Sequence, residues 1–358
     1  PKINKDKCIE CGLCKKVCPI LNKQKFDEFQ QKAYLFQNGD EIVRNTSTSG
    51  GFFSAISNYV IDNDGTVYGA VFNQEFIVEH VGTDKKEQLV RFRKSKYVQS
   101  KQNDVFREIK EKLEKGQLVC YSGTPCQVAG LQSYLQKEYQ NLILIDVVCR
   151  SVPSPKVLEK YKKHILKKMN ATKIESIDFR DKSKYGYKYS MMTIKTDRGV
   201  SSEGIDTDQY LRAFFSGCSI RPSCHRCQFK TQRRKSDITI WDCLNISELD
   251  KSLNDDKGTT RLLVQTSKGE EILKRLENVK LKELTVEKIL TGIREMTECV
   301  PINPNRKLFF EDIEEEYLFD KYFPINTKTR LHSGIRKFLS VTGLYNLTKS
   351  IAKKILRR

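Results

Sequence analysis

Four cysteines near the start of the chain have a spacing that suits iron–sulfur chemistry. Cys8, Cys11, Cys14 and Cys18 form the pattern Cys-x2-Cys-x2-Cys-x3-Cys, which a proline follows. Such short steps let thiolates surround one face of a 4Fe–4S cube, and Gly12 permits a close backbone approach to inorganic sulfide. Zinc sites rarely space four cysteines in this way. We therefore predict that these four cysteines bind 4Fe–4S clusters.

The fourth cysteine of this run raises the question of a second cluster. The segment resembles half of a two-cluster ferredoxin, in which the fourth cysteine of each run binds the cluster of the other run. The chain begins at Pro1 without an initiator methionine. We therefore expect 1–22 to be the second half of a truncated two-cluster head. The alternative is that Cys18 closes a single cluster by itself.

A second set of cysteines is dispersed through the body of the chain. Cys126 and Cys149 each follow a buried apolar run, QLVCYSG or NLILIDVVC, and Cys224 and Cys227 form a Cys-x2-Cys pair ahead of the apolar stretch DITI. That pair alone could also be a zinc site or a redox dithiol, but sets of four thiolates suit iron–sulfur clusters. We predict that the four thiols converge on an internal cluster. The remaining cysteines have no partner spacing and should be small buried apolar residues: Cys120, Cys218, Cys243 and Cys299.

The segments around these cysteines alternate between strands and helices. QLVCYSG and NLILIDVVC are typical of buried strands, and TPCQVAGLQSYLQK and SPKVLEKYKKHILKK of helices, the second with Ser154 as its cap and Pro155 in its first turn. Such a unit joins parallel strands by a right-handed crossover. Cys126 and Cys149 then follow the C-terminal ends of two strands, where open α/β sheets bind ligands. We predict an α/β fold (α+β overall) with a mixed sheet and βαβ units.

A glycine pair precedes another predicted helix closer to the N-terminus. Apolar residues recur at the helical period over 52–60. Ser49, Gly50 and Gly51 come directly before it, so that free backbone N–H groups could meet an anion there. The strand TVYGAVF and a helix near 103–115 should follow.

Composition excludes several classes of protein. The 358 residues suffice for two or three domains, and 38% hydrophobic with 30% charged residues is globular. The absence of an apolar span or an export leader makes us expect a cytoplasmic protein, in which twelve cysteines indicate metal or redox chemistry rather than disulfides. The net charge of +19 comes with no nucleic-acid-binding motif, so we expect no nucleic-acid partner.

The C-terminal tail is basic and has two amphipathic stretches. No acidic residue follows Asp320. Apolar residues recur at helical intervals on either side of Gly343: Leu331, Ile335, Phe338 and Leu339 before it, then Leu344, Leu347, Ile351 and Ile355. Either this stripe packs on the body of the chain, or the tail lies on an anionic membrane, where each basic side chain contributes about 1 kcal/mol. The basic residues are Lys328, Arg330, Arg336, Lys337, Lys349, Lys353, Lys354, Arg357 and Arg358.

Separated motifs in a fixed order together resemble the coenzyme F₄₂₀ hydrogenase/dehydrogenase beta-subunit family. They are TSTSGGFF, RKSKYVQS, GTPCQVAGL, VCRSVPSP, RPSCHRCQFK with SDITIWD, and RLLVQTSKGEEIL, within roughly residues 30 to 300. The resemblance implies a FAD site, often a fused ferredoxin head, and an internal 4Fe–4S cluster bound by Cys126, Cys149, Cys224 and Cys227. The flavin-binding candidates that it implies are Ser49, Gly50, Gly51, Lys94, Ser95, Lys96 and Tyr97, with Thr124 nearby.

The same resemblance implies a redox function. We expect an iron–sulfur flavoprotein oxidoreductase that moves electrons between 4Fe–4S clusters and a flavin, because clusters pass single electrons and a flavin can exchange pairs. Its redox partner would be a ferredoxin or reductase, and its substrate, unidentified, could belong to surface polysaccharide synthesis, as for bacterial family members similar to this chain. The alternative is a non-catalytic electron-transfer subunit that serves a partner enzyme. The tail could place the protein peripherally on the inner face of the membrane.

Two places depart from the family pattern. Cys149-Arg150-Ser151 stands where the family commonly has Cys-His-Gly, and 241–245 reads Trp-Asp-Cys-Leu-Asn where Gly-Asp-Phe-Trp-Gly is common. These changes leave the substrate and the catalytic residues open. We predict four segments: 1–22 as the ferredoxin-type head, 23–120 as an N-terminal beta-subunit-like region, 121–300 as a C-terminal region with the internal cluster, and 301–358 as a linker and basic amphipathic tail.

Overall fold

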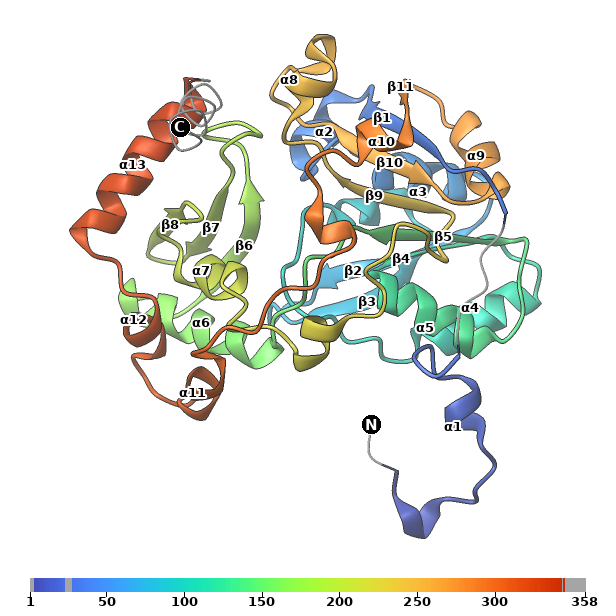
Figure 1. Cartoon of the computed structure of the whole chain (residues 1–358), viewed down its shortest axis with the longest axis horizontal. Helices are drawn as coiled ribbons and strands as arrows, with labels where there is room; N and C mark the ends of the chain where they lie inside the picture. Colours follow the sequence, from blue (N-terminus) through green and yellow to red (C-terminus); the bar gives the residue numbers. More distant parts are fainter. Residues whose placement is uncertain (1–2, 23–27, 343, 345–358) are drawn as a thin grey trace, which may run out of the picture.

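The structure, a computed structural model, describes residues 3–22, 28–342 and 344. Helix makes up 38% and strand 21% of it, which confirms the predicted α/β class. Within this described part, eight strands form one mixed sheet and three form a second, smaller sheet. Figure 1 shows the two sheets side by side in separate lobes, with the small sheet and its helices at the left.

The large sheet has a parallel centre and antiparallel flanks. Its strand order is β11-β1-β10-β9-β5-β4-β2-β3. The four strands β9, β5, β4 and β2 pair in parallel, and β3, β10, β1 and β11 are added antiparallel at the two sides. The bounds are β1 Lys32–Asn38, β2 Thr66–Phe72, β3 Val78–Thr83, β4 Val119–Gly123, β5 Leu142–Val147, β9 Ile238–Asp242, β10 Thr260–Val264 and β11 Val279–Leu284.

Helices cover both faces of this sheet. Alternate residues of β4 and β5 point to opposite faces, and both faces are buried, which explains why the two strands read as continuous apolar runs. On one face Cys120, Ile143 and Ile145 pack with α3 (Phe52–Asp62) and α9 (Ser267–Lys274). On the other, Tyr121 and Leu144 pack with α4 (Val105–Glu114) and α5 (Pro125–Leu135). Short helices complete this lobe: α2 Glu41–Thr46, α8 Ile246–Leu249 and α10 Val286–Ile289.

The small sheet has its own core. Its strands are β6 (Ile174–Asp181), β7 (Met191–Thr196) and β8 (Gly199–Glu203). Apolar residues of β6 and β7 pack against α6 (Pro155–Lys168), α7 (Gln209–Phe215), α11 (Arg306–Glu311) and α12 (Leu318–Tyr322). Phe179, Tyr210 and Phe309 are fully buried there, and burying each such ring stabilises the fold by about 1.5–3 kcal/mol.

The βαβ unit around the internal cysteines is as predicted, with one difference. β4, α5 and β5 follow each other, and the two strands pair in parallel. Pro155 begins α6, but the side chain of Ser154 makes no capping hydrogen bond, although the residue holds the cap position. The other predicted helices and strands agree with α3, α4 and β2 to within two residues at their ends.

The tail begins as predicted. The helix α13 covers Thr327–Val341, and Leu331, Ile335 and Phe338 on it are exposed, so this stripe does not pack on the body of the described chain. The second predicted amphipathic stretch falls almost entirely outside the described residues. Among the helices that the structure describes, none is long and apolar enough to cross a bilayer.

Candidate iron–sulfur centre and cofactor site

The internal cysteines gather at the C-terminal edge of the parallel strands. Cys126 is the second residue of α5, directly beyond β4, and Cys149 stands two residues beyond β5. Because β4 and β5 are parallel neighbours, both residues come to the same edge. Cys224 lies in a 3-10 turn, η3 (Pro222–Arg226), and Cys227 follows directly. This confirms the predicted position of the two strand-end cysteines.

A short antiparallel contact brings the Cys-x2-Cys pair to that edge. Pro153 and Ile220 form a β-bridge. Next to it the N–H of Ser154 donates to the carbonyl of Ser219, at 3.0 Å, and the N–H of Arg221 donates to the carbonyl of Val152, at 3.1 Å. The chain after Cys149 therefore runs beside the chain before Cys224.

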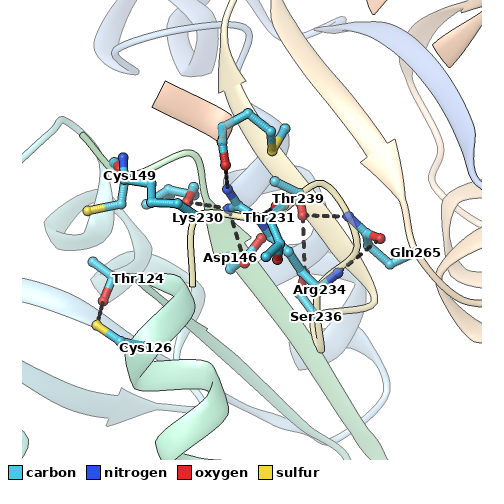
Figure 2. A network of polar contacts seen from close by, with 12 residues as sticks. Thr124, Cys126, Asp146, Cys149, Lys230, Thr231, Arg234, Ser236, Thr239 and Gln265 are labelled. Atoms are coloured by element: carbon cyan, nitrogen blue, oxygen red, sulfur yellow. Dashed lines mark hydrogen bonds and ion pairs between the residues drawn. The ribbon is translucent and has the colours of Figure 1, made fainter. Parts of the chain in front are cut away.

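Three of the internal thiols have a raised pKa, to which other thiols of the set contribute. Burial, together with negative charge on the other three thiols, raises the pKa of Cys149 to about 12, although Lys230 acts to lower it. The pKa of Cys224 and of Cys227 is also raised, by burial first and by other thiols of the set. Because such influence weakens with distance, the four sulfurs share one region. Figure 2 shows the sulfurs of Cys126 and Cys149 on the same side of the strand ends.

Backbone N–H groups stabilise two of these thiols in their anionic form. The N–H of Val152 lowers the pKa of Cys224, and the N–H of Phe229 lowers that of Cys227, each against the larger effect of burial. Hydrogen bonds to the sulfurs are one of the features that set the potential of a protein-bound cluster. These two contacts partly offset the burial that favours the neutral thiols, and they would stabilise the thiolates that bind iron.

The four internal thiols form an all-sulfur donor set. Among the described residues, no three Cys, His, Asp or Glu side chains stand close enough to hold one metal ion. A 4Fe–4S cube holds its thiolates farther apart than a single ion does, because each thiolate binds a different iron. Four thiols at a common edge of the sheet therefore have the ligand type that the predicted 4Fe–4S cluster requires.

Basic side chains hold the loops of this edge together. The amino group of Lys230 donates to the carbonyl of Cys149 and, at 2.8 Å, to the carbonyl of Glu295. Burial lowers the pKa of Lys230, whereas the thiols of Cys149 and Cys227 raise it. Arg150 Nη1 lies 3.1 Å from a carboxylate oxygen of Glu295. These cations face the region where thiolate charge would gather, so they offset it.

One residue differs from its predicted place, and one flavin candidate has a contact that was not predicted. The hydroxyl of Thr124, the flavin candidate, lies 3.2 Å from the sulfur of Cys126, and its part in flavin binding stays a prediction. Cys299 was expected to be a buried apolar residue, but it is half-buried and its sulfur accepts a hydrogen bond from the N–H of Cys227, at 3.2 Å. Cys299 follows Cys227 by 72 residues, so local spacing could not reveal the contact. The other three non-ligand cysteines are buried as predicted: Cys120, Cys218 and Cys243.

The head cysteines form a separate, open group. Cys8, Cys11 and Cys14 are exposed and Cys18 is half-buried. Gly12 has a left-handed φ of 70°, which favours glycine, and it precedes the short helix α1 (Leu13–Lys16). The side chain of Asn22 holds the end of this segment against the end of α1. Its amide group donates to the carbonyls of residues 15, 16 and 18, each at 2.9 Å.

The first flavin-candidate segment, 49–51, packs tightly against the large sheet. The hydroxyl of Ser49 donates to the carbonyl of Thr259 at 2.6 Å, and the N–H of Gly50 donates to the hydroxyl of Thr260 at 2.8 Å. A Cβ at Gly50 would lie 2.3 Å from the carbonyl oxygen of Phe36. Close packing of β1 and β10 therefore already requires a glycine there. Gly51, with a φ of 80°, caps α3.

The second candidate segment, 94–97, meets the first. The N–H of Ser95 donates to the hydroxyl of Thr48 at 2.8 Å. Lys94 forms an ion pair with Asp178 at 2.5 Å, and burial lowers the pKa of Lys96 to about 7. The ring of Tyr97 stacks on Phe214 at 5.1 Å, so Tyr97 packs into the core.

Basic residues surround these two loops between the lobes. Arg180 pairs with Asp242 at 2.7 Å and donates to the hydroxyl of Tyr97 at 3.4 Å. Burial, assisted by nearby Arg44, lowers the pKa of Lys182 to about 8. Such a group of cations suits an anionic phosphate. Its members are Arg93, Lys94, Lys96, Arg180 and Lys182.

Comparison with known proteins identifies two parts of the chain. Residues 116–289 match the family model for the C-terminal part of the coenzyme F₄₂₀ hydrogenase/dehydrogenase beta subunit, and residues 1–20 match the 4Fe-4S binding domain. In the segment that carries the internal cysteines, the chain belongs to the coenzyme F₄₂₀ hydrogenase/dehydrogenase beta-subunit family. Its ferredoxin-type head makes it an iron–sulfur protein with an electron-transfer function, as predicted.

Other comparisons add little to this family assignment. No curated protein matches the chain. Among solved structures, one match is a chain of a structure described as the xenon derivatization of the F₄₂₀-reducing [NiFe] hydrogenase complex from Methanosarcina barkeri. It is 15% identical, covers 82% of this chain and 93% of its own, and has a TM-score of 0.47, too low to support further conclusions.

The departures from the family pattern can now be placed in the fold. Arg150, at the usual histidine position, is held by Glu295 and by the carbonyl of Phe215, which accepts from its Nη2 at 2.9 Å. In the 241–245 segment, Asp242, which the chain shares with the family pattern, forms the ion pair with Arg180. The change at Arg150 therefore contributes contacts between distant segments of the chain.

Proposed function

We propose that this beta-subunit family member passes single electrons between its head cluster and an internal cluster, and exchanges them with a flavin. The observation that carries the proposal is the gathering of Cys126, Cys149, Cys224 and Cys227 at one sheet edge. When bound, the clusters supply one-electron steps and the flavin two-electron chemistry. The reaction class is then an oxidoreductase with a substrate still to be identified.

The chain's own residues would hold and insulate the internal cluster. Cys149 is half-buried. The ammonium group of Lys230 donates hydrogen bonds to the carbonyls of Cys149 and Glu295 and so holds these two segments together. The Thr124 hydroxyl can donate to the Cys126 thiolate. Hydrogen bonds and nearby charge tune a cluster potential, and both are present around these thiols.

FAD would lie against the two loops that meet between the lobes. The contact of Ser95 with Thr48 brings 94–97 beside the start of α3. The basic group there can bind a pyrophosphate by charge-assisted hydrogen bonds, with Lys96 and Lys182 as partly buried donors. Thr124, the remaining flavin candidate, has its hydroxyl beside the sulfur of Cys126.

The head would exchange electrons with a ferredoxin or reductase. Cys8, Cys11 and Cys14 are exposed, so a cluster held there is open to a redox partner. A role in surface polysaccharide synthesis rests on the sequence resemblance. One observation favours the second candidate function, an electron-transfer subunit that serves a partner enzyme: Arg150 replaces a histidine and is engaged by Glu295 and Phe215, so no proton donor is evident at that position.

Peripheral attachment to the inner face of a membrane is a further part of the proposal. The stripe Leu331, Ile335 and Phe338 on α13 is exposed, and no acidic residue follows Asp320 in the sequence. An exposed apolar stripe with basic flanks is the pattern of an interfacial helix.

Anaerobic reconstitution of the full chain with iron, sulfide and FAD tests the redox proposal. Reduced ferredoxin, the electron donor, is then added, and the flavin absorbance near 450 nm is followed, as is usual for flavins. We expect bound flavin to bleach. A chain that retains its clusters but binds no flavin would refute the flavoprotein function and leave the electron-transfer subunit. Flavin that binds but stays oxidised would refute the proposed electron path.

A further inference from the structure

A cavity of about 680 Å³ lies under the tail helix, and neither the internal cysteines nor the flavin-candidate loops line it. It is formed by α7, by α12 with the loop that follows, and by the first half of α13, which Figure 1 shows along the edge of the small lobe. Pockets for small ligands typically have volumes of about 300–1,000 Å³. We call this cavity the α13 groove and define it by Asp206, Arg212, Phe215, Phe323, Lys328 and His332.

The charge of the groove is positive. Arg212 is fixed by its Nη1, which donates to the carbonyls of Phe323, at 2.7 Å, and Pro324, at 2.8 Å. Lys328, on α13, adds a second cation to the lining. The acidic residue of the wall, Asp206, is already paired, because Arg336 Nη1 donates to both of its carboxylate oxygens at 2.8 and 3.0 Å. The groove therefore favours an anionic group.

The walls and the rim of the groove are apolar. Phe215 and Phe323 form part of its lining. On the neighbouring face of α13, Leu331, Ile335 and Phe338 are 62%, 52% and 63% exposed. At about 3.6 residues per turn, these three lie next to the face that carries Lys328. An anionic head group in the groove would thus have an apolar strip beside it along the helix.

One residue that lines the groove, Phe215, also contacts the residue next to Cys149. Phe215 lines the groove, its carbonyl accepts from Arg150, and the guanidinium of Arg150 lies 5.5 Å from the centre of its ring. Arg150 follows Cys149 directly in the chain.

We propose that the α13 groove binds a lipid-borne phosphate, with Arg212 and Lys328 at the phosphate and the lipid chain along Leu331, Ile335 and Phe338. The cations match the charge of a phosphate ester, and the exposed stripe matches an acyl or prenyl chain, whereas a free anion would leave the stripe uncovered. This inference extends the membrane attachment proposed above and does not depend on electron transfer.

The test uses the full chain, oxidised and without a reductant, and a lipid that dissolves as single molecules. Dihexanoylphosphatidic acid is titrated below its micelle concentration by isothermal titration calorimetry. We expect saturable binding, weakened at least tenfold by Lys328→Glu, about 1.4 kcal/mol. The control Lys307→Glu changes an exposed lysine of α11 outside the groove and should leave the affinity unchanged. Thermal unfolding of each variant verifies its fold, and Lys328→Gln should weaken binding less than the charge reversal.

Two further ligands distinguish binding of a lipid phosphate in the groove from binding of a free phosphate ion and from attachment to a charged membrane surface. Inorganic phosphate should bind far more weakly, because it cannot use the apolar stripe; equal affinity would overturn the lipid assignment. Vesicles of phosphatidylglycerol should bind as well. If they bind while the monomeric lipid does not, the helix attaches to a charged surface only and the groove proposal is wrong. Unchanged affinity of Lys328→Glu would refute it too. Because no electron donor is present, these results do not depend on the redox proposal.

Discussion

The guanidinium of Arg234 lies 3.3 Å from a carboxylate oxygen of Asp146, and both side chains are buried. Asp146 is in β5, which leads to Cys149, whereas Arg234 follows the Cys-x2-Cys pair. Arg234 also donates to the carbonyls of Thr231, at 2.9 Å, and Val147, at 3.1 Å. Figure 2 shows this network beside the internal thiols. One buried ion pair thus fixes the Cys-x2-Cys loop to the strand that presents Cys149.

Removing one partner of this pair should destabilise the fold strongly. Arg234→Met leaves Asp146 buried without its counter-charge, which typically costs about 3–5 kcal/mol. The double variant Arg234→Met/Asp146→Leu should recover most of that loss, because no unpaired charge remains. Urea unfolding at pH 7 measures both. A single variant that loses less than about 1 kcal/mol would contradict a role for the pair in holding the loop.

Thr124 should tune the internal cluster without changing its iron content. A hydrogen bond from its hydroxyl stabilises negative charge on the Cys126 sulfur, and such bonds raise cluster potentials because reduction adds an electron. Thr124→Val should shift the midpoint potential of the internal cluster to more negative values, and Thr124→Ser should restore it. A redox titration followed by EPR measures the shift. Equal potentials in all three proteins would show that the contact has no electronic effect.

Lys96 should make stability depend on pH in a defined window. Burial lowers its pKa from 10.5 to about 7, so between these pH values the unfolded chain holds a proton that the folded chain has released. Stability therefore rises with pH across the window, and the full cost of the buried charge is present below pH 7. Lys96→Met should be more stable than the wild type at pH 6 and lose this advantage near pH 10. The urea midpoints of the wild type and of Lys96→Met at both pH values test this, with Lys307→Met as the exposed control. A difference between the two midpoints that does not change with pH would contradict it.

The exposed stripe of α13 should mediate membrane attachment. We expect the full chain to sediment with anionic vesicles at low salt, because the stripe is exposed and the tail is basic. A chain truncated at Pro324, and the triple variant Leu331→Ser/Ile335→Ser/Phe338→Ser, should stay in the supernatant. Equal sedimentation of all three proteins, or none by the full chain at about 50 mM salt, where screening extends roughly 14 Å, would rule out this attachment.

Much of the large sheet could be predicted because its strands are buried on both faces. QLVCYSG and NLILIDVVC read as apolar runs, and the helices between and after them have a clear period. The position of Cys126 and Cys149 then followed from the rule that parallel strands share one C-terminal edge. The small sheet had no such signal: β8 reads GVSSE and is half-buried at most, so its strands lack a strong apolar alternation.

Contacts between distant segments could not be predicted from local patterns. The sulfur of Cys299 meets the Cys227 N–H across 72 residues, and Arg150 meets Glu295 across 145. Such pairs depend on how whole loops pack. Gly50 is a different case: the sequence suggested an anion-binding glycine, and the packing of β1 and β10 requires a glycine there for a separate reason. Its part in flavin binding stays a prediction.

The most direct test of the central claim is the iron content and EPR spectrum of Cys224→Ser. In the anaerobically reconstituted full chain, this substitution should remove about four irons and one EPR signal while the head cluster remains. Cys218→Ala, which changes a buried cysteine outside the set, should retain every iron. If Cys224→Ser keeps the iron content and spectrum of the wild type, or if the wild type binds one zinc that iron reconstitution does not displace, then no internal 4Fe–4S cluster is held at this sheet edge.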